Sequence, residues 1–445
     1  MLPNTDTIVA IATAQGRGGV GVVRVSGPKA ASIAQLILGK TPKTRYAHFA
    51  NFPDNNGQPI DQGLVLFFAA PHSYTGEDVL ELHGHGGAAV LQMVLQRCVY
   101  LGARLAEPGE FTRRAYLNNK LDLAQAEAVA DLIDATTTQA ARSAMRSLQG
   151  DFSAAVQNMV SDLVNLRMLV EAMLDFPEED IESVDVRRRN SQLQEIQSRL
   201  KQTLDAAKQG SLLREGAYVV LVGQPNVGKS SLLNCLSGEQ VALVSDIPGT
   251  TRDVICKEIQ IEGIPFHIMD TAGLRDSEDA IEKMGIALTH QTLKKADLIL
   301  LLREANLPIS PEESRIMASL PSEIPQLHVF NKIDLFKKNK MTQEVSTGIA
   351  VSAKTGEGIH ELRQKLLEMI GWSNIESGLF MARERHLLAL KEAGSRLFQA
   401  ENVIDRPELF AEELRLAQRA LNSITGEFTA DDLLGEIFSR FCIGK

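Results

Sequence analysis

Gly223-Gln224-Pro225-Asn226-Val227-Gly228-Lys229-Ser230 is the stretch that decides the fold. An apolar run at 218–222 precedes it and predicts a buried strand, and residues 231–236 follow it and predict a helix closed by Gly238. A glycine-rich loop between a strand and a helix, with Lys-Ser at the join, is typical of a phosphate-binding loop, and these neighbours disfavour an ordinary βα turn. Its N–H groups can hold phosphate oxygens, while Lys229 reaches the outer phosphates and Ser230 binds Mg²⁺.

Four further motifs follow this loop, each beside a predicted strand. They are, in chain order, Gly249-Thr250-Thr251-Arg252-Asp253, Asp270-Thr271-Ala272-Gly273, Asn331-Lys332-Ile333-Asp334 and Ser352-Ala353-Lys354. The strands are predicted at 254–261, 266–269 and 327–330, with one more short strand before Ser352. Strands that alternate with helices over 211–379 predict a doubly wound, mostly parallel sheet, with nucleotide at the carboxyl ends of its strands.

Each motif has a chemical role at a guanine-nucleotide site. A threonine of the first motif can complete the Mg²⁺ shell, Asp270 can hold Mg²⁺ through water, and the Gly273 N–H can bind the γ-phosphate. The Asp334 carboxylate can accept both N–H groups of the guanine edge. Adenine lacks that donor pair, so the carboxylate would stay unpaired at a cost of about 1–3 kcal/mol or more. Ser352 and its neighbours can close over the base, and together the motifs indicate a Ras-like GTPase.

One position departs from the Ras-like pattern. Leu274 stands where a glutamine orients the attacking water in Ras-like switches, and leucine cannot hydrogen-bond water. Hydrolysis therefore needs another group, and candidates lie in the loop 275–282. Asn226 offers a side-chain oxygen beside the β/γ bridge, where a bound monovalent cation could supply the charge of an arginine finger.

Residues 1–118 form a predicted compact α/β or α+β domain. Strands are predicted at 6–12, 21–25, 63–68 and 78–82, with a turn at 15–19 and a helix at 88–100. His83-Gly84-His85-Gly86-Gly87 is either a metal site or a strand-to-helix turn, and the lack of further ligands nearby in sequence favours the turn. Arg24 and Glu81 lie on apolar strands, which by default indicates a solvated strand face.

The remaining segments are helical. From 121 to 173 the pattern is helical, and the apolar steps from Met145 to Met173 predict one long helix, about forty residues and roughly 60 Å, that Pro177 ends. A second helix carries Leu193, Ile196, Leu200 and Leu204 and is predicted to close at Gly210. Helical patterns return at 381–399, 407–423 and 429–441. The predicted domains are therefore 1–118, 119–210, 211–379 and 380–445, with the nucleotide domain inserted into one split helical bundle domain.

Composition narrows the class of protein. The net charge of −10 opposes nonspecific nucleic-acid binding over the whole surface, although a local basic patch remains compatible with it. The sequence has no apolar run of membrane-spanning length and no signal-peptide pattern at 1–15, and its four cysteines have no CxxC spacing. These features predict a cytoplasmic protein without a membrane association.

The chain resembles the MnmE (TrmE) family of bacterial tRNA-modification GTPases over its whole length. The segments that make the resemblance specific are 16–21 (Gly-Arg-Gly-Gly-Val-Gly), 82–87 (Leu-His-Gly-His-Gly-Gly), 249–253 and the terminal Phe441-Cys442-Ile443-Gly444-Lys445. The resemblance implies a homodimer through the N-terminal domains and a heterotetramer with an FAD-containing partner, MnmG. Together they would modify carbon 5 of the tRNA wobble uridine (cmnm5U34 or nm5U34).

The resemblance also implies site residues. The family's positions for a tetrahydrofolate derivative (5,10-methylene or 5-formyl) match Arg24, Glu81, Lys120 and Lys445. The resemblance therefore implies that the first domain binds folate, and it replaces the default interpretation of Arg24 and Glu81 as residues of a solvated strand face. Asn226, Ser245, Ile247 and Thr250 match its K⁺ ligands, although the family commonly has Thr at Ser245. Glu282 matches the residue that orients water, and Cys442 matches a cysteine linked to modification, with a packing cysteine as the alternative.

The predicted catalytic positions are Glu282, Lys229, Thr251 and Cys442, and Mg²⁺ is predicted at Ser230 and Thr251. The predicted GTP positions are Asn226, Val227, Gly228, Lys229, Ser230, Ser231, Ser245, Asp246, Ile247, Pro248, Gly249, Thr250, Thr251, Asp270, Thr271, Ala272, Gly273, Asn331, Lys332, Asp334, Ser352, Ala353 and Lys354.

Two other functions were compatible with the motifs. A ribosome-assembly GTPase would act as a binding switch, but that class usually carries an RNA-binding module or a second GTPase domain, and neither is evident here. A helical scaffold whose GTPase regulates assembly is the other alternative.

Overall fold

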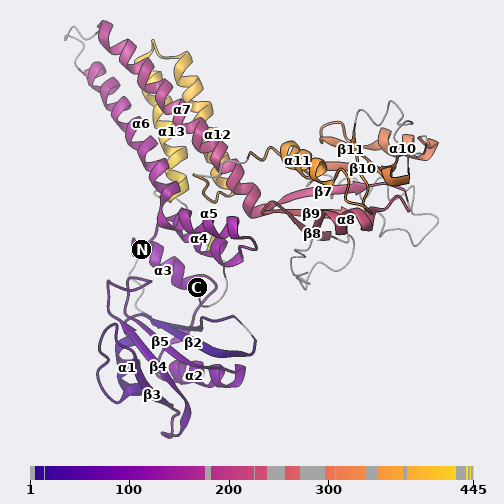
Figure 1. The fold of residues 1–445 in the computed structure, drawn as a ribbon. Coiled ribbons are helices and arrows are strands. Elements are labelled where there is room, and N and C mark those ends of the chain that lie inside the picture. Colours follow the sequence, from indigo (N-terminus) through magenta and orange to yellow (C-terminus); the bar gives the residue numbers. More distant parts are fainter. Residues whose placement is uncertain are drawn as a thin grey trace. The chain divides into compact units, whose positions relative to one another are not determined.

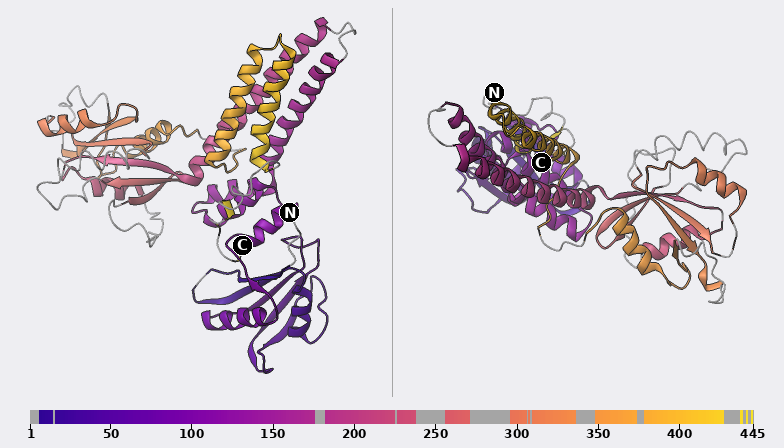
Figure 2. Two further views of the ribbon diagram at one scale, coloured as in Figure 1. Left: turned by 180° about the vertical axis from the view of Figure 1, so that it is seen from behind. Right: turned by 90° about the horizontal axis from the view of Figure 1, so that it is seen from above.

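The computed structural model describes residues 6–444 except 15, 176–181, 225, 238–255, 271–295, 306, 308, 336–347, 374–377, 427–436, 439–440 and 442–443. The chain divides into two compact units, whose elements are labelled in Figure 1 and seen from two further directions in Figure 2. Unit 1 comprises Met1–Ile133, Ser147–Leu200 and Ala389–Lys445, and unit 2 comprises Asp134–Arg146 and Lys201–Leu388. The domain limits at 118, 210 and 379 stay a prediction.

A six-stranded sheet with the order β3-β4-β5-β2-β1-β6 forms the N-terminal part of unit 1. Its elements are β1 Ile8–Ile11, β2 Gly18–Ser26, α1 Ala30–Leu38, β3 His48–Pro53, β4 Pro59–Phe68, β5 Val79–Gly86, α2 Ala88–Tyr100 and β6 Arg104–Leu105. Alternation places Val23 and Val25 of β2 in one core with α1 and α2, and leaves Arg24 on the other face. The predicted strands and α2 are confirmed. Strand β5 runs beyond its predicted end, so His83 and His85 lie on the strand itself rather than in a turn.

The helical pattern predicted for 121–173 is confirmed, but it forms three helices, so the prediction of one long helix that carries Met145 to Met173 is wrong. The three helices are α4 Leu123–Asp134, α5 Thr138–Gln149 and α6 Asp151–Asp175, and they follow α3 Glu110–Leu117. Gly150 separates α5 from α6 because its φ of 97° lies in the left-handed region, which ends a right-handed helix. The predicted apolar stripe is buried along α6, from Phe152 to Val170, but Met145 on α5 is exposed.

The second predicted helix is α7 Glu182–Glu215. In unit 1 it contacts α12 Glu384–Asn402 through Gln197 and α6 through Arg199, and α6 packs against α13 Pro407–Thr425. Gly210 does not close α7, contrary to the prediction. A Cβ at Gly210 would lie 1.9 Å from the Phe380 carbonyl oxygen, so this glycine permits a close backbone approach within unit 2. The helix ends instead at Glu215, because the next residue, Gly216, has a left-handed φ of 69°. None of the described helices is both long and apolar enough to cross a membrane.

Unit 2 contains a second six-stranded sheet, with the order β12-β11-β10-β7-β9-β8. Its elements are β7 Ala217–Val222, α8 Lys229–Ser237, β8 Cys256–Ile261, β9 Ile264–Asp270, β10 Leu298–Glu304, α10 Pro311–Ser319, β11 Gln326–Asn331, the 3₁₀ helix η3 Ile333–Leu335, β12 Ile349–Ala350 and α11 Ile359–Met369. All neighbours pair in parallel except β8 and β9. The predicted doubly wound, mostly parallel sheet is confirmed, and the carboxyl ends of β7, β9, β11 and β12 meet at one edge.

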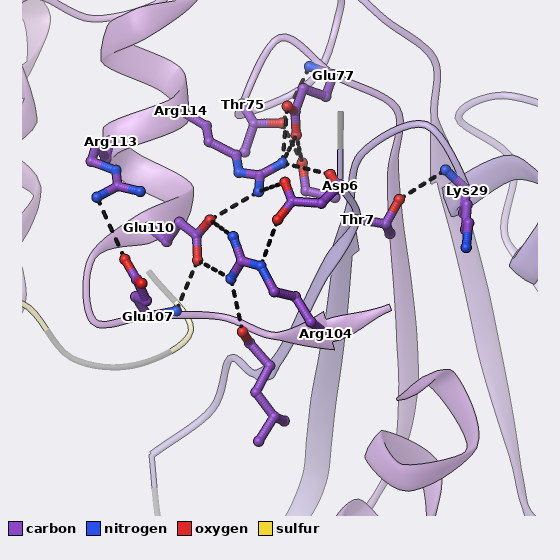
Figure 3. A network of polar contacts seen from close by, with 12 residues as sticks. Asp6, Thr7, Lys29, Thr75, Glu77, Arg104, Glu107, Glu110, Arg113 and Arg114 are labelled. Carbon is purple, nitrogen blue, oxygen red and sulfur yellow. Dashed lines mark hydrogen bonds and ion pairs between the residues drawn. The ribbon is translucent and has the colours of Figure 1, made fainter. Parts of the chain in front are cut away.

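A buried ion-pair network joins α3 to the N-terminal sheet (Figure 3). Arg114 is 0% exposed, and its Nη2 donates to Asp6 Oδ1 and Glu110 Oε1, each at 2.8 Å. Its Nη1 donates to Glu77 Oε1 at 3.1 Å. Arg104 donates to both oxygens of Glu110, at 2.6 and 2.8 Å. Buried charges of both signs therefore satisfy one another at the junction of helix and sheet.

Low pH is expected to reduce the free energy of unfolding of unit 1, because it protonates the Glu110 carboxylate. Burial on its own raises the pKa of the Glu110 carboxyl, but hydrogen bonds from Arg104, the Glu107 N–H and Arg114 outweigh burial and lower this pKa to about 2. Because the folded pKa lies below the ordinary value, the stabilisation is present above about pH 4.5 and is lost as pH falls toward 2. We expect a loss of about 3 kcal/mol in the free energy of unfolding from this group over that window.

The acid effect can be measured by hydrogen exchange in increasing urea, read on peptides of β1 and β2. The variant Glu110→Gln should lose this part of the pH dependence between pH 5 and 2.5. The matched control is Glu107→Gln, since Glu107 is exposed and contacts Arg113 at 3.5 Å on the surface. An unchanged pH dependence in Glu110→Gln would contradict the assignment.

Candidate functional site

The phosphate-loop sequence lies between the end of β7 and the start of α8 (Figure 1). Asn226 and Gly228 take left-handed φ values of 65° and 92°. A Cβ at Gly228 would lie 2.4 Å from Asn331 Nδ2, so only glycine fits this position without displacing a buried side chain. The first turn of α8 has no acidic residue, so the N–H groups at this helix end suit an anion such as a nucleotide phosphate.

Lys229 lies over this loop. Its ammonium donates to the carbonyl oxygens of Gly223 at 2.8 Å and Gln224 at 3.2 Å, and the residue is only 8% exposed. The side chain therefore folds back across the loop instead of extending into solvent. This arrangement places a cation where phosphate oxygens would lie against the loop.

Asn331 connects the phosphate loop to the loop after β12. It is 2% exposed, its Nδ2 donates to the Val227 carbonyl at 2.8 Å, and its Oδ1 accepts from the Ala353 N–H at 3.0 Å. One buried amide thus fixes the distance between the loop that would hold phosphate and the loop that would enclose the base. Substitution would leave two buried backbone groups without partners.

Asp334 is oriented by Ser352. The residue is exposed on η3, and its Oδ1 accepts from Ser352 Oγ at 2.6 Å, while Ser352 Oγ accepts from the Thr355 N–H at 3.1 Å. Nearby, Lys332 pairs with Glu304 at 2.7 Å. The carboxylate is thereby held toward solvent at the carboxyl edge of the sheet, with lone pairs left for the donors of a base.

The structure describes only part of the predicted nucleotide site. Ser230 and Ser231 are exposed in the first turn of α8, Lys354 is exposed beside Ala353, and Asp270 is the last residue of β9. The positions predicted for GTP, Mg²⁺, K⁺ and the attacking water that lie outside the described part are Ser245, Asp246, Ile247, Pro248, Gly249, Thr250, Thr251, Thr271, Ala272, Gly273 and Glu282.

A second cluster lies on the face of the N-terminal sheet opposite α1 and α2. Arg24 of β2 and Glu81 of β5 are directly paired across the strands, and Arg24 Nε donates to Glu81 Oε1 at 2.9 Å. The Arg24 guanidinium lies 5.5 Å from the Tyr74 ring centroid and 5.8 Å from that of Phe111. Burial raises the pKa of the Tyr74 hydroxyl, which bonds Thr112 at 2.8 Å. Neither aromatic residue could be predicted as part of a site from the sequence, because neither stands in a recognisable motif.

Lys120 and the chain terminus lie on the same unit as this cluster. Lys120 is exposed, and a Cβ at Gly76 would lie 3.3 Å from its Cγ, two residues from Tyr74. Lys120 also borders a cavity of about 590 Å³ that α6 and the end of α13 line. Gly444 approaches the Ile11 carbonyl of β1 closely enough to exclude a side chain. The neighbouring Cys442 and Lys445 lie outside the described residues.

The sequence matches two family models, one for each side of position 121. A model described as the GTP-binding protein TrmE N-terminus matches residues 7–120, and a model described as the MnmE helical domain matches residues 123–442. The chain belongs to the MnmE family.

Full-length relatives in the MnmE family are closely similar. The tRNA modification GTPase MnmE of Nitrosomonas eutropha is 57% identical and that of Nitrosospira multiformis 58%, and each match covers 100% of both chains. The Chromobacterium violaceum relative of the same name is 56% identical over 99% of this chain and 98% of its own.

Solved structures show more limited similarity. An Era variant of Aquifex aeolicus bound to GDP·AlF4⁻ is 28% identical over 40% of this chain and 66% of its own, with a TM-score of 0.27. The G domain of FeoB from T. maritima is 29% identical over 34% of this chain and 98% of its own, also with a TM-score of 0.27. The assignment to the MnmE family therefore rests on the family models and the full-length relatives.

Proposed function

We propose that this chain is a cytoplasmic GTP hydrolase that modifies carbon 5 of the tRNA wobble uridine together with the FAD-containing protein MnmG. The products would be cmnm5U34 or nm5U34, and a tetrahydrofolate derivative would supply the one-carbon unit. The observation that carries the proposal is the buried Asn331 side chain, which links the phosphate-binding loop to the loop that would enclose the base. Membership of the MnmE family supports the tRNA reaction.

Different residues of the described part would bind the phosphates and the base of a guanine nucleotide. The N–H groups at the start of α8 and Lys229 would bind the phosphates, and Asp334 would accept the two donors of the guanine edge. Mg²⁺, held by Ser230 and Thr251, would neutralise phosphate charge. Asn331 keeps the two loops at a fixed separation, which sets the span available to a nucleoside.

The Arg24 cluster is the proposed folate site. Arg24, Glu81, Lys120 and Lys445 would bind the cofactor, and the close-packed β2 and β5 strands hold the first two in register. Within the described part of the chain, the Nη groups of Arg24 have no hydrogen-bond partner, although the Nε is paired. Unpaired donors near two aromatic rings suit a flat, polar ring with acceptor atoms.

Hydrolysis is expected to depend on potassium. Leu274 cannot orient water, so a K⁺ ion held by Asn226, Ser245, Ile247 and Thr250 would supply positive charge while Glu282 orients the water. Paired GTPase domains of a homodimer would share this arrangement. Since an arginine finger is worth roughly 10³–10⁵ in rate, we expect GTP turnover at least about tenfold faster in K⁺ than in Na⁺ at equal ionic strength. Equal turnover in both salts would contradict this role.

A reconstituted reaction tests the proposed function. Purified chain, MnmG with its FAD, unmodified tRNA, GTP, 5,10-methylenetetrahydrofolate and an amine (glycine for cmnm5U34, ammonium for nm5U34) should yield modified wobble uridine, detected by nucleoside mass spectrometry. Omission of the folate, or the variant Arg24→Ala, should abolish modification while GTP hydrolysis continues. GTP hydrolysis without any modification of tRNA would contradict the proposal and favour a binding switch, such as a ribosome-assembly GTPase.

A further inference from the structure

The His-Gly-His segment of β5 provides a second donor to Glu81. His83 lies two residues after Glu81 on the same face of the strand, and its Nε2 is 3.1 Å from Glu81 Oε2. Arg24 holds the other oxygen, Oε1, from the neighbouring strand β2 at 2.9 Å. The carboxylate is therefore fixed at both oxygens, by groups on two paired strands. Both donors and the carboxylate are partly exposed, so the cluster is open to a ligand.

The geometry decides which tautomer this contact needs. A carboxylate can only accept, so the His83 nitrogen that faces Glu81 must carry the proton. In the neutral ring Nδ1 is then an acceptor, and within the described residues it has no hydrogen-bond partner. The remaining lone pairs of Glu81, the Nδ1 acceptor and the Nη donors of Arg24 together form a mixed donor and acceptor surface.

We propose that His83 is a positioning residue of the folate site: its Nε2–H holds the Glu81 carboxylate so that the free lone pairs of Glu81 meet the N–H donors of a pterin ring. This inference rests on the proposed folate function. Without the His83 bond, Glu81 would keep only its contact with Arg24 and could rotate about its terminal torsion. A carboxylate that must be ordered on binding gives weaker affinity than one already in place.

His85 is a natural control within the same segment. It lies two residues further along β5, and its Nδ1 and backbone N–H contact the two oxygens of Asp61, each at 2.7 Å. It therefore belongs to a separate pair with a different carboxylate. Its ring is 69% exposed, so truncation should disturb packing little.

The test measures the affinity of the full-length protein for 5-formyltetrahydrofolate by titration calorimetry, with thermal unfolding as a check on folding. His83→Ala should weaken binding roughly tenfold, His83→Gln should restore most of the affinity because the glutamine amide keeps a donor, and His85→Ala should change it less than twofold. In a Glu81→Gln background, His83→Ala should add almost nothing, since the contact through Glu81 is already altered.

The outcomes separate the two proposals. Absence of wild-type binding would overturn the folate site and, with it, the role of His83. Wild-type binding that His83→Ala leaves unchanged would overturn only the role of His83. Equal losses from His83→Ala in the wild-type and Glu81→Gln backgrounds would also overturn that role, because His83 would then act independently of Glu81.

Discussion

Asp334→Asn is expected to lower GTP affinity at least about 100-fold and to raise affinity for xanthosine triphosphate. The asparagine keeps an oxygen for the Ser352 hydroxyl, which now donates to Asp334 Oδ1 at 2.6 Å, so the loop geometry should persist. The other side-chain atom changes from an acceptor to an NH₂ donor, which opposes the donors of guanine. Xanthine has a carbonyl in place of the 2-amino group and would accept that donor.

Equilibrium binding of fluorescent GTP and xanthosine triphosphate analogues measures this switch. The control is Glu357→Gln, since this exposed residue lies in the same loop and contacts Ser352 only through its backbone carbonyl. It should leave GTP affinity within about twofold. Wild-type GTP affinity in Asp334→Asn would remove Asp334 from base recognition.

Arg114→Met is expected to destabilise unit 1 by about 3–5 kcal/mol. Methionine keeps an unbranched apolar side chain but has no charge, so Glu110 and Glu77 would lose their shared cation. Glu110 is only 1% exposed and would keep Arg104 as its remaining charged partner. Removing one member of a buried ion network leaves desolvated charge, which costs far more than loss of a surface pair.

Urea unfolding followed by hydrogen exchange on β1 and β2 peptides measures the loss. Arg113→Met is the matched control, because Arg113 is adjacent in sequence but 33% exposed, and it contacts Glu107 at 3.5 Å. It should change stability by less than about 0.5 kcal/mol. Similar effects of the two variants would contradict a special role for the buried network.

The phosphate loop and the parallel sheet could be predicted because local sequence determines them. Apolar strands, Gly228 with its positive φ and the Lys-Ser helix start act within a few residues of one another. The role of Asn331 could be predicted only in part. The motif places it at the base loop, but its bond to Val227 links positions that are 104 residues apart, which no local pattern reveals.

The wrong predictions of helix ends have a common physical cause, since local sequence does not reveal the backbone conformation that tertiary packing selects. Gly210 is typical of a helix end in sequence, but in the structure it makes room for the Phe380 carbonyl, a contact that depends on tertiary packing. An apolar stripe with helical spacing runs across Gly150, from Leu148 to Phe152, yet the left-handed φ of Gly150 divides the helix. The buried Arg114 was not predicted, although the spacing from Glu110 to Arg114 is the i, i+4 spacing of a helical ion pair. Helix α1 and strand β3 were not predicted, and β3 is an edge strand with Phe49 exposed.

The most direct measurement is nucleoside analysis of tRNA from cells that lack this protein. We expect that the wobble uridine loses its carbon 5 modification, that the wild-type gene restores it, and that the Asp334→Asn gene does not. Normal wobble modification in the deletion strain would contradict the account.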